Sequence, residues 1–125
     1  FITITVASGA SSLECREVAY CIAESPLVKT ALFAEDPNWG RILAAVGRSG
    51  LENLDLQSIT IDLGSVRIVS GGGVDPSYLE ALGQVAMQKE EIVISVNLNR
   101  GSFSESVWTS DFSHEYISIN SDYRT

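Results

Sequence analysis

With 125 residues, the chain is long enough for one domain with its own hydrophobic core. A formal net charge of −8 and a pI of about 4.4 argue against nucleic acid or an anionic membrane as a partner. No apolar run approaches the roughly 20 residues that a membrane-spanning helix needs, and no signal-peptide pattern is present.

Residues 1–6 alternate apolar side chains with threonine, which predicts a strand. Its apolar face carries Ile2, Ile4 and Val6. A native chain rarely begins inside a strand, because the strand's edge and its apolar face need a neighbour. The start therefore suggests a processed product or an excised domain.

The next predicted element is a helix that begins after Ser11. Ser11 and Glu14 have the spacing of a capping box, in which the serine caps the first turn and Glu14 reaches back to the N–H of Ser11. The apolar stripe of this helix consists of Cys15, Val18, Ala19 and Ile22. Pro26 predicts that the helix ends at about Ser25, and residues 27–33 are expected to be extended or irregular.

A second helix is predicted from Pro37. Asp36 is a suitable N-cap, and proline suits the first helical position because its missing N–H costs nothing there. The apolar stripe consists of Trp39, Ile42, Leu43 and Val46. Gly47 and Gly50 mark the end. On spacing alone, this pattern favours a core helix over a functional site.

The middle of the chain predicts a hairpin. Residues 58–63 and 66–70 read as strands, and Gly64-Ser65 between them fits a two-residue loop with glycine first. Residues 51–57 are ambiguous. Gly71-Gly72-Gly73 predicts a turn at positive φ, since it lacks the Gly-Lys-Ser/Thr ending of a phosphate-binding loop.

Asp75-Pro76 repeats the cap-plus-proline pattern and predicts a third helix. Its inward side chains are expected to be Tyr78, Leu82, Val85 and Ala86. Three further strands are predicted at residues 91–99, 103–109 and 115–120. This mixture indicates an α+β fold: a single domain over residues 1–125, with a mixed sheet of about five strands and helices packed on one face.

Few side chains suggest catalysis. His114, the only histidine, lies in a polar connector and is interpreted as a surface turn residue. Cys15 and Cys21 lie six apart on one predicted helix and point in different directions, so reduced thiols are expected. One histidine and two cysteines at this spacing cannot complete a tetrahedral zinc site.

The last six residues bring polar groups of several kinds close together. They are the side chains of Asn120, Asp122, Arg124 and Thr125, together with the terminal carboxylate. Such groups can hold the ammonium and carboxylate of an amino acid. On chemistry alone, a frayed tail is the simpler interpretation.

Residues 25–50, which run from Ser-Pro-Leu-Val-Lys-Thr to Val-Gly-Arg-Ser-Gly, resemble the signature region of the ornithine acetyltransferase family. These are the bifunctional glutamate N-acetyltransferases of arginine biosynthesis. The resemblance extends to Val18-Ala19, residues 71–75, Trp108-Thr109 with Asp111, and residues 119–125. It implies that the chain is the C-terminal domain of the family's β chain. The catalytic threonine, exposed by self-cleavage at a Lys-Gly-Thr motif, would then precede Phe1.

The resemblance implies transfer of an acetyl group from N-acetylornithine to glutamate by a ping-pong mechanism through an acyl-threonine, with acetyl-CoA as a second donor in some members. Asn120 and Thr125 match residues that contact the substrate in the family, and no catalytic residue, cofactor or metal is expected in this chain. The implied partners are the α chain and the remainder of the β chain, in a larger homo-oligomer of αβ units. The implied location is the cytoplasm, or the mitochondrial matrix in a eukaryote. Lys29 and Arg41 have no assigned role, and holding the turn together is the simpler interpretation.

Two alternatives stay open at this stage. The chain could be a non-catalytic binding or assembly module, or part of a related acyltransferase of secondary metabolism with another acceptor. A Lys-Gly-Thr motif upstream of Phe1 in the parent protein would favour an enzyme.

Overall fold

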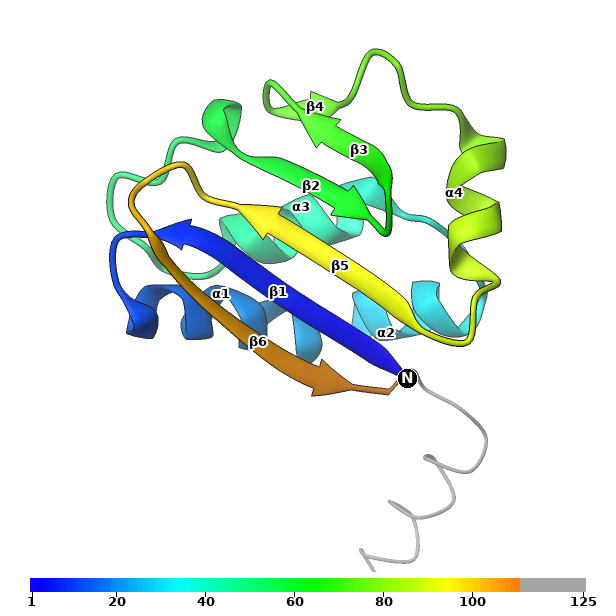
Figure 1. Cartoon of the computed structure of the whole chain (residues 1–125), viewed down its shortest axis with the longest axis horizontal. Coiled ribbons are helices and arrows are strands. Elements are labelled where there is room, and N and C mark those ends of the chain that lie inside the picture. The colour runs from blue at the N-terminus through cyan, green and yellow to red at the C-terminus, as the bar shows by residue number, and fades with distance from the viewer. Residues whose placement is uncertain (111–125) are drawn as a thin grey trace, which may run out of the picture.

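The computed structural model describes residues 1–110, which form a mixed six-stranded sheet with helices (Figure 1). The strands are β1 (Ile2–Gly9), β2 (Thr60–Leu63), β3 (Val66–Ser70), β4 (Gly73–Val74), β5 (Ile92–Asn97) and β6 (Phe103–Thr109). Their order is β4-β3-β2-β5-β1-β6, with β1 and β5 parallel and the other neighbours antiparallel. The predicted α+β class is confirmed. The sheet has one strand more than expected because the two-residue β4 adds to its edge, and the strand predicted at 115–120 lies outside the described residues.

Four α-helices and one short 3₁₀ turn occur in residues 1–110. They are α1 (Ser12–Ala23), α2 (Pro26–Phe33), α3 (Trp39–Gly47), η1 (Leu56–Ser58) and α4 (Glu80–Met87). Figure 1 shows α1, α2 and α3 on one face of the sheet, as predicted. The helix α4 instead packs beside β3 and β2. None of these helices is long and apolar enough to cross a membrane.

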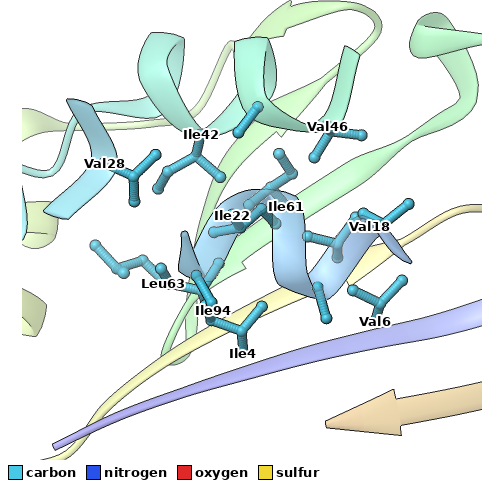
Figure 2. Close-up of a cluster of buried hydrophobic side chains, with 14 of the residues drawn as sticks. Ile4, Val6, Val18, Ile22, Val28, Ile42, Val46, Ile61, Leu63 and Ile94 are labelled. Carbon is cyan, nitrogen blue, oxygen red and sulfur yellow. The ribbon is translucent and has the colours of Figure 1, made fainter. Parts of the chain in front are cut away.

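The core lies between the sheet and these three helices (Figure 2). The sheet contributes Ile4, Val6, Ile61, Leu63 and Ile94, and the helices contribute Val18, Ile22, Val28, Ile42 and Val46. Each of these side chains is at most 4% exposed. The apolar face predicted for β1 is therefore confirmed, and β2 and β5 bury alternate side chains in the same way, because alternate side chains of a strand point to the same face.

The opposite face of the sheet is not covered by any helix among residues 1–110. Thr3 and Thr5 of β1 lie there, opposite Trp108 and Ser106 of β6. The Trp108 side chain is 63% exposed. Hydroxyl groups and an exposed indole give this face a mixed polar and apolar character.

The first helix begins as predicted, but the segment after it does not. The Ser11 hydroxyl accepts a hydrogen bond from the N–H of Glu14 (3.1 Å), whereas the Glu14 carboxylate accepts from the N–H of Ala10 rather than that of Ser11. The extended conformation predicted for residues 27–33 is wrong. They belong to α2, because Ser25 caps a new helix and Pro26 occupies its first position.

The cap predicted for the next helix is also wrong. Asn38 caps α3 by accepting from the N–H of Arg41 (3.0 Å), while Asp36 accepts from the Asn38 side-chain amide (2.9 Å). The helix therefore begins at Trp39 rather than Pro37. In its predicted stripe, Ile42 and Val46 are buried, and Trp39 and Leu43 are partly buried against the core.

The third predicted helix starts later and turns a different face inward. Asp75 accepts hydrogen bonds from Ser70 and Ser77 instead of capping a helix, and α4 begins only at Glu80. Leu82 and Val85, predicted to face inward, are 49% and 58% exposed. Ala86, also predicted to face inward, is buried together with Gly83 and Met87, and Tyr78, which precedes the helix, is partly buried against the core. Hydrophobic spacing therefore misplaces Leu82 and Val85, because a glycine at the contact carries no apolar signal.

The predicted glycine turns are confirmed. Gly64 (φ 61°) lies in the loop of the β2–β3 hairpin, in which Leu63 pairs with Val66. Gly71 (φ 60°) and Gly72 (φ 84°) form the turn between β3 and β4. Positive φ strains residues with a Cβ, which explains the glycines at these positions.

An ion pair between Arg100, which follows β5, and Glu14 in α1 helps to join three segments that are far apart in the sequence. The Arg100 guanidinium donates from Nε and Nη2 to the two Glu14 carboxylate oxygens, at 2.9 Å each. Its Nη1 donates to the backbone carbonyls of Glu52 and Asn53. Burial opposes ionisation of Glu14, but hydrogen bonds from Arg100 and from the N–H of Ala10 outweigh it and hold its pKa below the usual value.

Candidate substrate-binding site

The candidate site lies at the end of the sheet where β1 begins. The strands β1, β5 and β6 meet there. Ile2 at the start of β1 pairs with Thr109 at the end of β6, and the N–H of Ile92 in β5 donates to the carbonyl of Phe1 (3.1 Å). The described part of the chain therefore ends close to Phe1. The predicted site residues Asn120 and Thr125 lie outside the described residues, as does His114.

A hollow of about 310 Å³ lies at this end of the sheet. Its lining comes from β1, β5 and the ends of α2 and α4: Phe1, Ile2, Leu32, Phe33, Glu35, Met87, Gln88, Lys89, Glu90 and Ile92. The volume is at the lower end of the range for small-molecule sites. Two carboxylates and one ammonium thus line a space that matches a small ligand in size.

Sequence reasoning missed this grouping. From the sequence, Glu35, Lys89 and Glu90 had no assigned role. Glu35 follows α2 in a left-handed conformation (φ 54°), with its N–H donated to the carbonyl of Leu32. This left-handed residue ends α2, because the N–H of the next residue, Asp36, donates to the carbonyl of Ala31 (2.8 Å). No local signal links Glu35 to Lys89, because only packing of α2 near α4 brings them together.

The lining chemistry suits binding rather than bond cleavage. Glutamate and lysine side chains can pair with the ammonium and carboxylate of an amino acid. Among residues 1–110, the lining of the hollow includes no serine, threonine, cysteine or histidine side chain that could act as a nucleophile or an imidazole base. Among residues 1–110, no three histidine, cysteine, aspartate or glutamate side chains lie together in a way that could hold a metal ion.

Comparison with known proteins decides the family. The sequence model described as the ArgJ family matches residues 1–125. The chain belongs to the ArgJ family. It is 54% identical over 125 residues to the arginine biosynthesis bifunctional protein ArgJ of Pseudomonas fluorescens (strain Pf0-1), and 52% identical to that of Pseudomonas syringae pv. tomato. Each alignment covers 100% of this chain and 31% of the relative, so the chain spans about a third of their length.

A solved ArgJ structure has the same fold. The crystal structure of the arginine biosynthesis bifunctional protein from Bacillus halodurans superposes with a TM-score of 0.87 and 32% sequence identity. The match covers 98% of this chain and 57% of that chain. The resemblance found from residues 25–50 and the shorter motifs is confirmed.

Within the signature stretch of this ArgJ family member, Arg41 has a structural role. Its Nη1 donates to the carbonyl of Leu27 (3.0 Å) and to the hydroxyl of Thr30 (3.3 Å), which links α3 to α2. This agrees with the simpler interpretation that Arg41 holds the turn together. Lys29 lies on α2 between Leu27 and Thr30 in the sequence. It also takes part in a polar or electrostatic interaction.

Both cysteines of the chain are free thiols. Cys15 is buried, and its Sγ donates to the carbonyl of Phe103 (3.3 Å). Burial is the main cause that raises the pKa of both thiols above the usual value. Because the thiolate is the reactive form, neither is activated as a nucleophile.

Proposed function

We propose that this chain is part of an acetyltransferase of arginine biosynthesis that moves an acetyl group from N-acetylornithine to glutamate and releases ornithine. The observation that carries the proposal is 54% identity, over all 125 residues, to an arginine biosynthesis bifunctional protein. In the proposed reaction, a threonine hydroxyl attacks the acetyl carbonyl and ornithine leaves as the amine. The glutamate amine then attacks the acyl-threonine and restores the hydroxyl.

The described residues support a substrate-holding role for the end of the chain. Ile2 lines the hollow together with Glu35 and Lys89, and it pairs with Thr109, the residue before the last one that the structure describes. We place Asn120 and Thr125 at the same substrate, as groups that hold its charged ends and take no part in bond formation. The chain needs no cofactor for this role, and acetyl-CoA is a proposed second donor.

The proposal makes this domain dependent on other parts of a longer protein. The catalytic threonine would come from a segment that precedes Phe1, and the α chain and the rest of the β chain would be its partners. The uncovered sheet face with Thr3, Thr5 and the exposed Trp108 suits docking onto that remainder, because it mixes hydroxyls with apolar area. We expect a homo-oligomer of αβ units in the cytoplasm, or in the mitochondrial matrix in a eukaryote.

Deletion of Tyr123–Thr125 from the full-length enzyme tests the site. Most acetyl transfer from N-acetylornithine to glutamate should be lost, because the tail supplies binding groups, while circular dichroism and the melting temperature stay unchanged. Ser121→Ala is the matched control, since it alters the same segment by one hydroxyl only and should keep full activity. Full activity after the deletion would show that the tail is not part of the site. A panel of acyl acceptors in the same assay separates glutamate from the acceptors of a related acyltransferase.

A further inference from the structure

A second hollow, of about 750 Å³, lies on the exposed side of α1. It is bounded by one face of α1, by the start of α2 at Pro26 and by the end of α3 at Arg48 and Ser49. Its volume falls within the range of small-ligand sites. Its lining shares no residue with the hollow at the end of the sheet, and the proposed function does not use it.

Two large apolar side chains of α1 face solvent along this hollow. Leu13 is 60% exposed and Tyr20 is 47% exposed. They are seven positions apart, or about two helical turns, so they lie on the same face of α1. Pro26 at the start of α2 adds to the apolar part of the lining, on which a branched or aromatic group can pack.

Unpaired charges of both signs line the same space. Arg16 is paired with Glu105 (3.0 Å), but Arg48 has no ion-pair partner within 4.0 Å among residues 1–110. The same holds for Glu17 and Glu24 in the part of the chain that the structure describes. A purely anionic ligand would meet two carboxylates here, and a purely cationic ligand would meet a guanidinium.

Two uncharged groups complete the lining. The Ser49 hydroxyl is buried and has no hydrogen-bond partner among the described residues. The Cys21 thiol also lines the hollow: burial raises its pKa first, Glu24 and Glu17 raise it further, and Arg48 opposes them. Charges of both signs therefore line the part of the hollow near Cys21.

We propose that this hollow binds a zwitterionic α-amino acid with an aromatic or branched side chain. Its carboxylate pairs with the Arg48 guanidinium, its ammonium lies toward Glu24, and its side chain packs along Tyr20. A zwitterion satisfies both signs of charge at once, which neither a simple anion nor a simple cation does. Binding here makes and breaks no covalent bond.

Protection of Cys21 from N-ethylmaleimide in the full-length protein tests the proposal. Trypsin cleavage after Arg16 and Lys29 releases residues 17–29 with Cys21 alone, so mass spectrometry separates its labelling from that of buried Cys15. The probes are L-phenylalanine, phenylacetate and phenethylamine, which carry the same ring with both charges, the negative charge only or the positive charge only. With a dissociation constant of about 1 mM, about 5 mM L-phenylalanine leaves roughly one site in six free and slows labelling about sixfold.

The expected result is strong protection by L-phenylalanine and much weaker protection by the two singly charged probes. Arg48→Gln should remove the protection, whereas Arg67→Gln, which makes the same charge change outside the hollow, should keep it. Equal protection by all three probes, no protection by L-phenylalanine, or protection that survives Arg48→Gln would overturn the proposal. Absence of Cys21 labelling in the full-length protein would overturn it as well, because the hollow would then be covered. None of these outcomes bears on acetyl transfer, which is measured separately.

Discussion

Replacement of Arg100 by methionine should cost this domain about 3 kcal/mol of unfolding free energy. The Glu14 side chain is only 10% exposed, and Arg100→Met removes both guanidinium hydrogen bonds to its carboxylate. Breaking a fully buried pair costs about 3–5 kcal/mol, because the remaining charge is left uncompensated. The expected value lies at the lower end of this range, because the Arg100 side chain is 25% exposed and the Ala10 N–H still bonds Glu14.

Urea unfolding of the 125-residue chain, followed by tryptophan fluorescence, measures the effect. With an m-value of about 1.5 kcal/mol/M, the midpoint should fall by about 2 M. Arg67→Met is the matched control: it breaks the Arg67–Asp62 pair, whose side chains are 49% and 31% exposed, and should cost less than about 1 kcal/mol.

The dependence on pH distinguishes a charge effect from lost packing. In the native chain the pKa of Glu14 is lowered from 4.5, so its contribution is present above pH 4.5 and is lost as the pH falls through the lowered pKa. In Arg100→Met, burial instead favours the neutral carboxyl, which can take up a proton in the folded state. The difference between the two proteins should therefore shrink in acid. Equal effects of the Arg100 and Arg67 variants, or a difference that does not change with pH, would refute this reasoning.

Three further predictions concern stability and titration. Trp39→Ala should cost about 2 kcal/mol in urea unfolding, less than the roughly 3–5 kcal/mol of a fully buried aromatic, because Trp39 is only partly buried; a cost near zero would place it outside the core. Gly83→Ala should destabilise by about 1–3 kcal/mol despite better helix propensity, because the new Cβ would collide with the Tyr78 ring. Gly40→Ala, whose Cβ has open space except for one contact at 3.6 Å, is the tolerated control. Burial, then the charge and hydrogen bond of Glu80, raise the pKa of Tyr78 to about 12. A Tyr78→Phe variant should therefore lack tyrosinate absorbance that the chain gains only as the pH approaches about 12. Tyr78 ionises first in the unfolded chain, so its contribution to stability should fall as the pH rises from about 10 to 12, and a difference in absorbance that is complete near pH 10 would contradict this.

Errors in the sequence prediction follow from competition between nearby caps. Asp36 and Asp75 both precede a proline, yet Asn38 caps α3 and Asp75 bonds Ser70 and Ser77 instead. Asp36 and Asp75 each had more than one possible hydrogen-bond partner, and spacing in the sequence does not show which partner is preferred. Ser25 showed the reverse error, because Pro26 was taken as the end of one helix when it is also the start of the next.

The candidate site was predictable only in part. Residues 25–50 and the closing motif were enough to indicate the family, since a long motif is specific in sequence alone. The roles predicted for Asn120 and Thr125 remain predictions, because both lie outside residues 1–110. Lys89 and Glu35 carried no signal, since each looks like an ordinary solvated charge in its own segment.

By itself, the sequence determined the faces of the strands, the Ser11 cap, the glycine turns and the family, because each depends on residues close together in the chain. Only the tertiary structure decided that β1 lies between β5 and β6, that Glu14 meets Arg100 86 positions away, and that two hollows form where separate helices meet. The physical reason is that hydrogen bonding within a turn and side-chain periodicity act over a few residues. Pairing between distant strands instead depends on how the whole apolar surface is buried.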